Sequence, residues 1–360
     1  MIRPIFISEG LRMFRRRHFS LQKRFQGNAN QICSRIVNSC WNGRYFQTSL
    51  GHFCEFYTRD FGWCTESLLK LDYKEKVRKS LEYALEKFKD NKGVTVAISP
   101  TGVCFDFPYY APDSIAYLLQ SLRLLNDKKL INKYRSFLEK EIQRFETIAL
   151  DKKTGLIRAD RYFSSMKDYA QRKSSCYDNC MLAVVTREAK KLKIKNNLEG
   201  FSAYKKRIKN KFWNGGYFFD DLNEEKCVSG DANVIPFYME VFDETKMVKS
   251  AVKSLQHEKL DRPFPLKYLT HVPSHKMLSI EIFAGDYERD TIWMHLGLMY
   301  LKILKKIDEK QFLFHKDQYR RLIEKHHNFL EVFDKNGKPF STPFYYTDEG
   351  MLWAANYLTL

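Results

Sequence analysis

The sequence lacks the features of a membrane-spanning or secreted chain. No run of about 18 apolar residues occurs in its 360 positions, so we predict no transmembrane helix. The first residues carry charges and contain no apolar core of roughly 7–15 residues, so we expect no signal peptide. These absences favour a cytoplasmic protein with no membrane partner.

Cysteine pairs with the spacing of a zinc or redox site are also missing. The eight cysteines form no CxxC motif, and Cys176 and Cys180, four residues apart, have no second ligand pair to accompany them. We therefore predict reduced thiols, no metal site and no cofactor. Reduced, buried thiols are typical of the cytoplasm.

Linkers are absent as well, since the 10 prolines and 16 glycines are spread along the chain and no segment is rich in Pro, Gly and Ser. This favours one domain. Aromatic residues are instead abundant, at 15% of the chain with 28 Phe and 21 Tyr. They can fill a large core or line a cleft.

Acidic residues are too few to balance the basic ones, which leaves a net charge of +18. Most lysines, such as Lys74, Lys76 and Lys79, are scattered through helical stretches and indicate solvated helix faces. The cluster 15–17, three arginines, could contact nucleic acid or anionic lipid. We expect no specific nucleic-acid partner, and at most a non-specific, salt-dependent contact between the basic surface and polyanions.

Apolar residues recur with helical spacing along most of the chain. Ile115, Leu118, Leu122 and Leu125 share one face, and Pro112 precedes them where a helix favours proline. Similar stripes cover residues 131–145, 181–189, 198–212, 292–303, 319–330 and 351–358. Roughly ten to twelve helices joined by short turns predict a series of antiparallel helix hairpins.

A short sequence element occurs twice. The segment 40–46 contains Trp-Asn-Gly followed by Tyr-Phe, and the segment 212–218 repeats this pattern after another helical stripe. Such a repeat suits a closed ring of hairpins. The alternative is a chance similarity, because Asn-Gly turns are common.

Four segments between the stripes are rich in carboxylates, arginine and aromatics, namely 56–63, 109–114, 164–179 and 342–353. Cleavage of a glycosidic bond needs one carboxylic acid that protonates the leaving oxygen and a second carboxylate on the opposite face. Each segment also has a structural interpretation. Asp113 and Glu349 lie where helices begin, and carboxylates stabilise that end. Arg59 and Asp60 could form a surface ion pair.

In this order the segments resemble the six-hairpin, or (α/α)6, glycosidases, which include glucoamylases, the glucosidase part of glycogen debranching enzymes and glucosidases that trim mannosylglycerate. Thr58-Arg59-Asp60 resembles their early sugar-binding segment. The segment 165–172 resembles the one that carries the general acid, although Lys167 departs from the pattern. The segments 111–114, 177–182, 212–218, 289–293 and 345–353 resemble others of the family, and the last of these carries the general base. The resemblance spans about residues 28–360.

The resemblance implies an all-α (α/α)6 toroid over residues 28–360, preceded by a basic N-terminal extension over 1–27. It implies an inverting glycoside hydrolase that acts on an α-glucosidic or related small glycan. Asp168 would be the general acid and Glu349 the general base, roughly 6.5–9.5 Å apart. Asp348 competes with Glu349, and Asp113 is an alternative acid. The residues expected to bind substrate are Arg59, Asp60, Trp63, Asp113, Tyr177, Asp178, Arg289 and Trp293.

The alternative from another class is a toroid that has lost catalysis and binds a glycan or a polyanion. The two interpretations differ in the placement of the carboxylates. A non-catalytic toroid predicts that Asp168 and Glu349 do not face one cleft.

Overall fold

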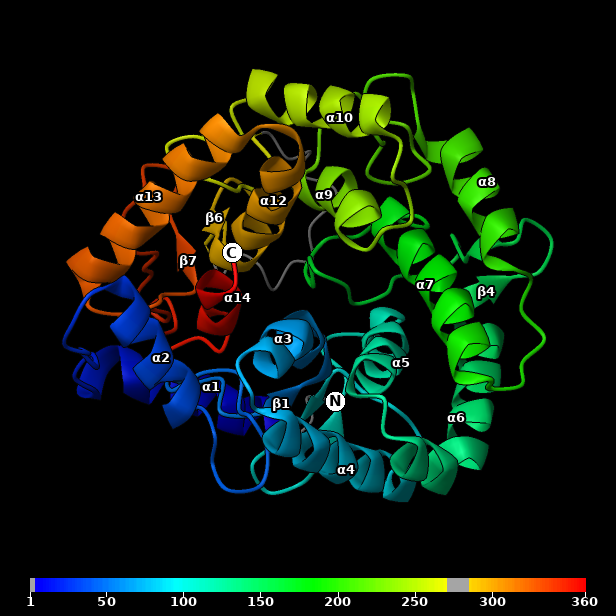
Figure 1. Ribbon diagram of the computed structural model, residues 1–360, viewed down its shortest axis with the longest axis horizontal. Helices are drawn as coiled ribbons and strands as arrows, with labels where there is room; N and C mark the ends of the chain where they lie inside the picture. The colour runs from blue at the N-terminus through cyan, green and yellow to red at the C-terminus, as the bar shows by residue number, and fades with distance from the viewer. Residues whose placement is uncertain (1–3, 271–284) are drawn as a thin grey trace.

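The computed structural model describes residues 4–270 and 285–360. In this part of the chain, twelve helices form two concentric rings (Figure 1). The inner ring consists of α3 (Thr58–Lys70), α5 (Asp113–Leu125), α7 (Cys176–Leu192), α9 (Gly230–Tyr238), α12 (Met294–Ile307) and α14 (Ala354–Leu358). The outer ring consists of α2 (Ala29–Ser39), α4 (Lys74–Asp90), α6 (Lys128–Ala149), α8 (Phe201–Phe212), α10 (Thr245–His257) and α13 (Glu309–His326). The predicted all-α (α/α)6 toroid is confirmed.

The two ends of the chain close the ring. Helix α14, the last inner helix, packs against α2, the first outer helix, and against α3, the first inner one. Each remaining inner helix packs against the outer helix that follows or precedes it in sequence. The fold is therefore a circle of helix hairpins whose final pair joins residues more than three hundred positions apart.

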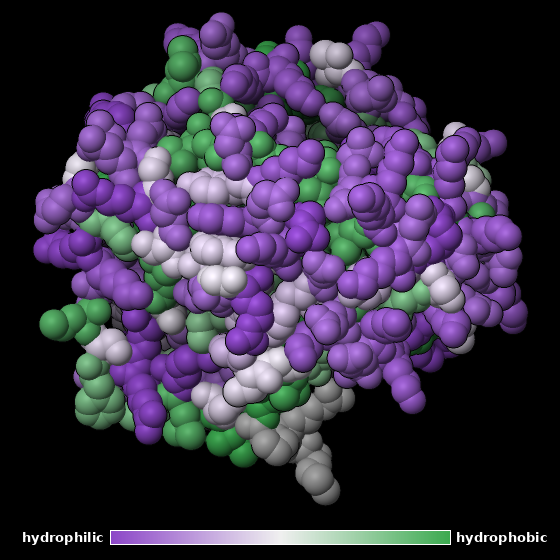
Figure 2. All heavy atoms as spheres, turned by 60° about the horizontal axis from the view of Figure 1, so that its bottom comes forward, coloured by the Kyte–Doolittle hydropathy of each residue, from purple (hydrophilic) through white to green (hydrophobic). Residues whose placement is uncertain are grey.

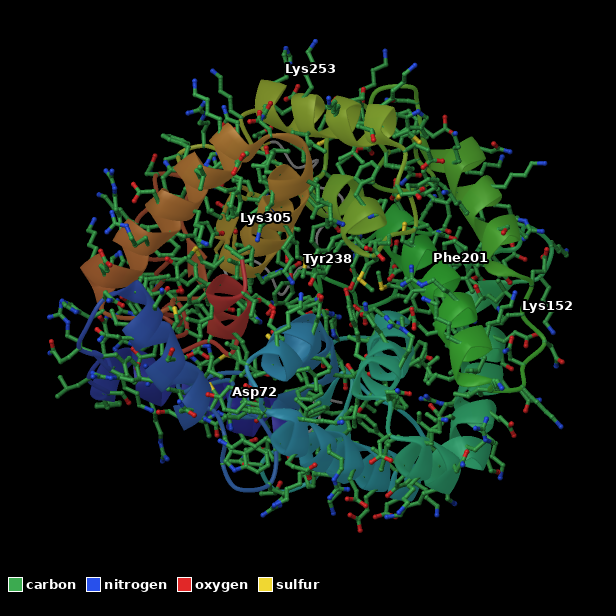
Figure 3. The ribbon with its side chains drawn as sticks, viewed as in Figure 1. Asp72, Lys152, Phe201, Tyr238, Lys253 and Lys305 are labelled. Carbon is green, nitrogen blue, oxygen red and sulfur yellow. The ribbon has the colours of Figure 1, made fainter. Side chains whose placement is uncertain are left out.

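Burial explains the composition of each ring. In α12, ten residues including His295 and Gly297 are buried, because neighbours surround an inner helix on all sides. Outer helices such as α4 and α10 bury one apolar stripe and expose the rest. Lysine occupies the exposed faces, and Lys253 on α10 points away from the ring (Figure 3). The scattered lysines are thus solvated helix faces, as predicted.

Local signals set many of the helix boundaries. The side chains of Asn28, Asp127 and Ser175 accept hydrogen bonds from amides in the first turns of α2, α6 and α7. Asn126 ends α5 in the left-handed region, with φ of 54°, and the chain reverses directly into α6. Short turns of this kind make the hairpins.

The repeated Trp-Asn-Gly element forms the same turn at both positions. Asn42 accepts from the amides of residues 44 and 45, and Asn214 accepts from those of residues 216 and 217. In each copy the tryptophan forms an isolated bridge with the phenylalanine five residues later. The likeness is therefore structural and does not stop at the shared dipeptide.

Strands of two residues connect the helices at one end of the ring. β1 (Phe56–Tyr57), β2 (Ala97–Ile98) and β3 (Cys104–Phe105) form an antiparallel sheet, and β4 (Leu150–Asp151) pairs with β5 (Leu156–Ile157). β6 (Ile292–Trp293) pairs with β7 (Val332–Phe333), with Trp293 opposite Val332. Four predicted helical stripes extend beyond the observed helices. Residues 292–293 are a strand before α12, and α13 ends at His326, before residues 329–330. Residues 198–200 precede α8, and residues 351–353 precede α14.

The segment predicted as a basic extension contains helix α1 (Pro4–Phe19), which lies outside the two rings. Its Phe6 packs on a small cluster that includes Val96 and Phe105. Arg16 pairs with Glu349, and the Arg17 side chain donates to the Thr342 carbonyl at 3.1 Å. The domain boundary at residue 27 stays a prediction, but α1 is packed onto the toroid.

None of the helices in the described ranges is both long and apolar enough to cross a bilayer. All eight cysteines are free, and five of them are buried.

Close contact between α12 and α13 gives a test of the packing. A Cβ atom at Gly297 would lie 1.9 Å from the Tyr319 hydroxyl and 2.4 Å from the Pro265 carbonyl oxygen. Tyr319 cannot move freely, because its hydroxyl bonds to Pro265 and Met294 carbonyls at 2.9 and 3.1 Å. We predict that Gly297→Ala lowers the free energy of unfolding by about 1–3 kcal/mol in denaturant titration.

Gly216 provides the control, since a Cβ there meets only one side-chain atom at 3.6 Å. Equal stability of the Gly297→Ala and Gly216→Ala proteins would contradict this description of the α12–α13 interface.

Candidate active site

The first turns of the inner helices meet at one end of the ring, and several carry a carboxylate. Asp60, Asp113, Asp178 and Asp231 occupy the first turns of α3, α5, α7 and α9, and all four are buried. The partial positive charge at each amino end stabilises negative charge there. The topology therefore gathers acidic groups from distant parts of the sequence around one point.

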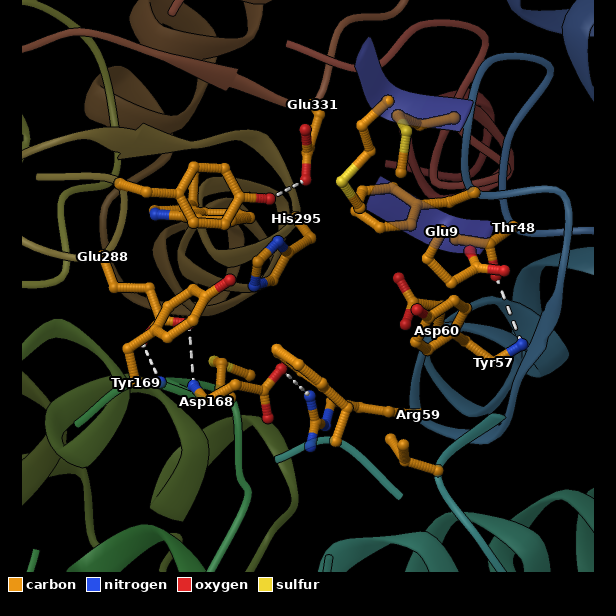
Figure 4. A pocket seen from close by; sticks show the side chains of 18 of the residues that line it. Glu9, Thr48, Tyr57, Arg59, Asp60, Asp168, Tyr169, Glu288, His295 and Glu331 are labelled. Atoms are coloured by element: carbon orange, nitrogen blue, oxygen red, sulfur yellow. Dashed lines mark hydrogen bonds and ion pairs between the residues drawn. The ribbon is translucent and has the colours of Figure 1, made fainter. Parts of the chain in front are cut away.

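A cavity of about 380 Å³ opens at this end, within the usual range for small-molecule sites. The predicted residues Arg59, Asp60, Trp63, Asp168 and Trp293 line it. Further polar groups in its wall are Glu9, Thr48, Tyr57, Tyr169, Tyr268, Tyr287, Glu288, His295, Glu331, Tyr345 and Trp353. Figure 4 shows Asp168 and Glu331 on opposite sides of this space, with His295 between them.

Arg59 lies at the centre of a buried ion network. Its Nε donates to Asp113 Oδ2 at 2.6 Å, and its Nη1 lies 3.5 Å from Asp168 Oδ2. Tyr177 also donates to Asp113 Oδ2, at 2.6 Å. Asp113 and Tyr177 are absent from the cavity wall. Asp113 contacts Arg59 and Tyr177 contacts Asp113, both from outside the cavity wall. The structure therefore does not place either residue where it would touch a bound sugar.

Asp168 lies in a loop that other carboxylates hold in place. The backbone amides of Asp168 and Tyr169 donate to the two oxygens of Glu288, each at 2.7 Å. Lys167 turns the opposite way and donates to Asp220 at 3.0 Å and Ser229 at 2.9 Å. Lys167 is therefore absent from the cavity wall, whereas Asp168 lines it.

Burial raises the pKa of Asp168 to about 6, with Arg59 acting against the rise and Asp113 adding to it. Asp178, which was expected to bind substrate, instead bonds to Ser175 in the first turn of α7 and lies outside the cavity wall. The neighbouring negative charge that raises the pKa of Asp168 belongs to Asp113.

The predicted base Glu349 does not reach the cavity. Its Oε1 accepts from the Lys23 amide at 2.9 Å and pairs with Arg16. The neighbouring Asp348 accepts from the amides of His52 and Phe53, each at 3.0 Å, and from the Ser49 hydroxyl. Both carboxylates fix the N-terminal segments onto the ring. The predicted pair of Asp168 and Glu349 therefore does not share one cleft.

Glu331, which the sequence interpretation missed, faces the cavity in their place. Tyr287 and Tyr345 donate to its two oxygens, and the Asp348 amide donates at 3.0 Å. Burial and the charge of Asp348 raise the pKa of Glu331 to about 8, and the two phenol hydroxyls act against this rise. A signal was present in the sequence, because Glu331 is a single carboxylate within the apolar run 329–333.

Arg289 is the remaining predicted residue outside the cavity wall. Its Nε lies 3.1 Å from Asp286, three residues earlier. Trp293, four positions later, does line the cavity.

Aromatic rings and one histidine make up the floor. The rings of Trp63 and His295 stack with centroids 4.4 Å apart and planes 9° apart. Asp60 accepts from the Trp353 indole at 2.8 Å, and burial raises the pKa of Asp60 to about 7. Flat faces with fixed polar edges suit a sugar ring, which presents C–H groups on its faces and hydroxyls around its rim.

His295 has a defined tautomer. The Tyr268 hydroxyl gives its proton to the Met166 carbonyl at 2.8 Å, so the contact of 3.1 Å with His295 Nε2 requires a hydrogen on Nε2. Burial and the nearby Arg59 keep the pKa of His295 well below its usual value. His295 Nδ1 is then an acceptor that has no partner among the described residues.

Three other buried polar atoms of residues in the cavity wall share this state in the described part of the chain, namely Asp168 Oδ1, Arg59 Nη2 and Trp63 Nε1. Buried polar atoms are nearly always hydrogen-bonded in native proteins. An acceptor, a carboxyl oxygen and a guanidinium donor around one cavity are the groups that a ligand with several hydroxyls would satisfy.

Comparison with known proteins supports the fold. No family model and no curated protein matches the sequence, but solved structures do. A rhamnosidase from Klebsiella oxytoca with rhamnose bound has a TM-score of 0.64 at 11% identity, over 94% of this chain and 65% of its own length. The GH63 mannosylglycerate hydrolase from Thermus thermophilus in complex with glucose has a TM-score of 0.59 at 11% identity, over 93% and 100%. A wild-type glycosidase has a TM-score of 0.62 at 7% identity, over 99% and 97%. At such identities the likeness establishes the (α/α)6 toroid fold.

The hydrogen bonds around His295 give a spectroscopic prediction. We expect the ring to remain neutral, as the Nε2–H tautomer, from pH 8 down to about pH 6, because burial disfavours its charged form. Nitrogen-15 spectra of histidine-labelled protein measure this directly, with His295→Asn to assign the signal. A protonated ring at pH 6, or a hydrogen on Nδ1, would show that the network is wrongly described.

Proposed function

We propose that this chain is a glycoside hydrolase in which Asp168 is the general acid and Glu331 the general base. The observation that carries the proposal is that these two carboxyl groups line opposite sides of one cavity (Figure 4). Glycosidic cleavage needs this arrangement, with one group at the leaving oxygen and the other on the far face of the sugar. The reaction requires no cofactor.

The hydrogen bonds favour this division of the two roles. Glu331 accepts from two hydroxyls and one amide, which stabilise its ionised form and suit a base. Asp168 has an oxygen, Oδ1, without a partner in the described chain, which can carry a proton to the substrate. The order of the two pKa values alone would place the proton on Glu331. We give the hydrogen bonds more weight, because an amide and two hydroxyls are placed to donate to Glu331, whereas Asp168 Oδ1 has no such donor in the described chain.

The proposed mechanism is inversion in a single displacement. Glu331 activates a water molecule that attacks the anomeric carbon, and Asp168 protonates the leaving oxygen as the bond breaks. Arg59, Asp60, His295 and Trp293 hold the sugar. The proposed substrate is an α-glucosidic or related small glycan, and the free cysteines suit the cytoplasm as the proposed compartment.

A product-resolved screen tests the proposal. The purified protein is incubated with α- and β-linked disaccharides, and proton NMR follows the anomer released first. Inversion predicts that this anomer is opposite to the substrate's. A complete lack of hydrolysis across the panel would favour the alternative, a toroid that binds glycans without cleaving them.

Substitution of the two carboxyl groups should separate their roles. Asp168→Asn and Glu331→Gln should each lower kcat by about 10²–10⁴, because each removes one proton transfer and preserves side-chain volume. Glu349→Gln is the matched control and should retain activity, since Glu349 bonds to Arg16 and Lys23 outside the cavity.

Glycosyl fluorides distinguish the acid from the base. Fluoride leaves with little protonation, so Asp168→Asn should hydrolyse the fluoride much faster than the disaccharide, and Glu331→Gln should be slow on both. The reverse pattern would exchange the two roles. Near-normal turnover in either variant would remove that residue from the mechanism.

The pKa values also predict a bell-shaped dependence of kcat/KM on pH. Below about pH 6 both carboxyl groups are protonated and no base remains, and above about pH 8 both are ionised and no acid remains. One proton is held between the two groups in the interval, so both limbs appear whichever group carries it. A rate that is flat from pH 5 to pH 9 would be incompatible with this pair.

A further inference from the structure

The cavity has a second wall that the proposed chemistry does not use. Phenylalanine and methionine side chains from four separate segments form it. They are Phe6 and Met13 of α1, Phe53 of the loop before α3, Phe105 of β3, Phe107 of the loop before α5, and the exposed Phe344. A sugar recognised through its hydroxyls has little use for so many apolar side chains.

This wall begins beside the proposed acid. The rings of Tyr169 and Phe107 lie 6.0 Å apart, and Tyr169 directly follows Asp168. The ring of Phe107 lies 5.1 Å from that of Phe6, which in turn lies 6.2 Å from Phe105. The acid protonates the oxygen of the leaving group, so the leaving group emerges on the Asp168 side. The apolar wall therefore lies where the aglycone must be.

The charges of α1 that face the protein are already paired. Arg12 binds Glu9 and Glu55, and Arg16 binds Glu349. Glu9, the acidic residue of α1 in the cavity wall, shares Arg12 with Glu55. Burial, with the charge of Glu9 adding to it, raises the pKa of Glu55 to about 8, so at neutral pH Glu55 is protonated and Arg12 balances Glu9. This wall presents an apolar surface to a ligand and does not favour a charged aglycone.

We propose that the substrate is a glycoside with an apolar aglycone, an alkyl chain or an aromatic ring, held by Phe6 and Met13 of α1 together with Phe107. This inference rests on the proposed hydrolase function, because that function places the leaving group beside Asp168. Each methylene group buried against the wall should improve binding about fourfold.

Such an aglycone can come from a free glycoside or from a glycolipid in a membrane. Helix α1 carries a feature that distinguishes these sources. Its outer face exposes Ile7, Leu11 and Phe14, which are 56%, 55% and 40% accessible and follow one helical stripe. Hydrophobic side chains also gather along the lower edge of the otherwise mainly hydrophilic surface in Figure 2. An amphipathic helix with basic residues, here including Arg15, can lie on an anionic bilayer.

Binding provides the first test and does not depend on turnover. The Asp168→Asn protein is titrated calorimetrically with methyl and n-octyl glycosides of glucose and mannose, in both anomers and below the micelle concentration. We expect at least one octyl glycoside to bind more than about tenfold tighter than its methyl counterpart. Equal affinity for every pair would overturn the proposal. Tighter octyl binding without hydrolysis by the unmodified chain would instead count against the hydrolase function alone.

Paired variants of α1 locate the effect. Phe6→Ser with Met13→Ser should reduce the ratio of octyl to methyl affinity at least tenfold, whereas Leu11→Ser with Phe14→Ser, on the outer face of the same helix, should leave it unchanged. Circular dichroism confirms that both proteins are folded. An unchanged ratio in the Phe6 and Met13 variant would show that α1 does not hold the aglycone.

Vesicles then identify the source of the aglycone. A glycosyl diacylglycerol of the preferred sugar is presented in phosphatidylcholine vesicles with and without phosphatidylglycerol. A slower reaction of the Leu11 and Phe14 variant on vesicles, with an unchanged reaction on monomeric octyl glycoside, supports a membrane glycolipid. Equal rates of the two proteins on both substrates support a free apolar glycoside.

Discussion

The buried ion pair between Arg59 and Asp113 is the interaction on which the site depends. It joins the first turns of two neighbouring inner helices, with 2.6 Å between Nε and Oδ2, and both residues are buried. A buried ion pair adds little net stability, but loss of one partner costs roughly 3–5 kcal/mol because it leaves the other charge unpaired. The main effect of this ion pair is to fix the position of the Arg59 side chain. Asp113 holds the guanidinium against Asp168, and the two charges have opposite effects on the pKa of Asp168.

Much of this arrangement could be predicted from the sequence because it depends on local signals. Apolar stripes define the helices, and caps such as Asn126-Asp127 mark the hairpins. Once the chain is a ring of hairpins, the first turns of all inner helices must lie at one end. Arg59, Asp60 and Trp63 then share a cavity with Asp168 and Trp293. Tyr177 and Asp113, which were expected to bind substrate, lie in the first turns of α7 and α5 but outside the cavity wall. Periodicity does not reveal which side of a buried helix faces a cavity.

The proposed base, Glu331, was not predicted because its position depends on pairing between distant segments. Glu331 precedes β7, and the segment 345–349 runs alongside it, with the Glu331 amide bonded to the Asp348 carbonyl at 3.0 Å. Side chains of paired strands alternate between faces, so neighbouring carboxylates have different surroundings. Asp348 binds the loop 49–53 and Glu349 binds the N-terminal segment, whereas Glu331 faces the cavity. Helical periodicity carries no information on an isolated bridge such as that between Leu330 and Glu349, which lie nineteen positions apart.

The N-terminal segment adds side chains to the cavity from outside the two rings of helices. Charge alone indicated a basic extension that could contact polyanions, but Arg12, Arg16 and Arg17 all bind groups of the protein itself. Those contacts fix α1 over the end of the ring where the carboxylates converge. The toroid supplies Asp168, Glu331 and the floor of the cavity, and α1 supplies Phe6 and Met13 to the wall beside them. In the proposed reaction the acid and the base come from loops of the toroid, whereas the choice of leaving group would depend on a helix outside the two rings.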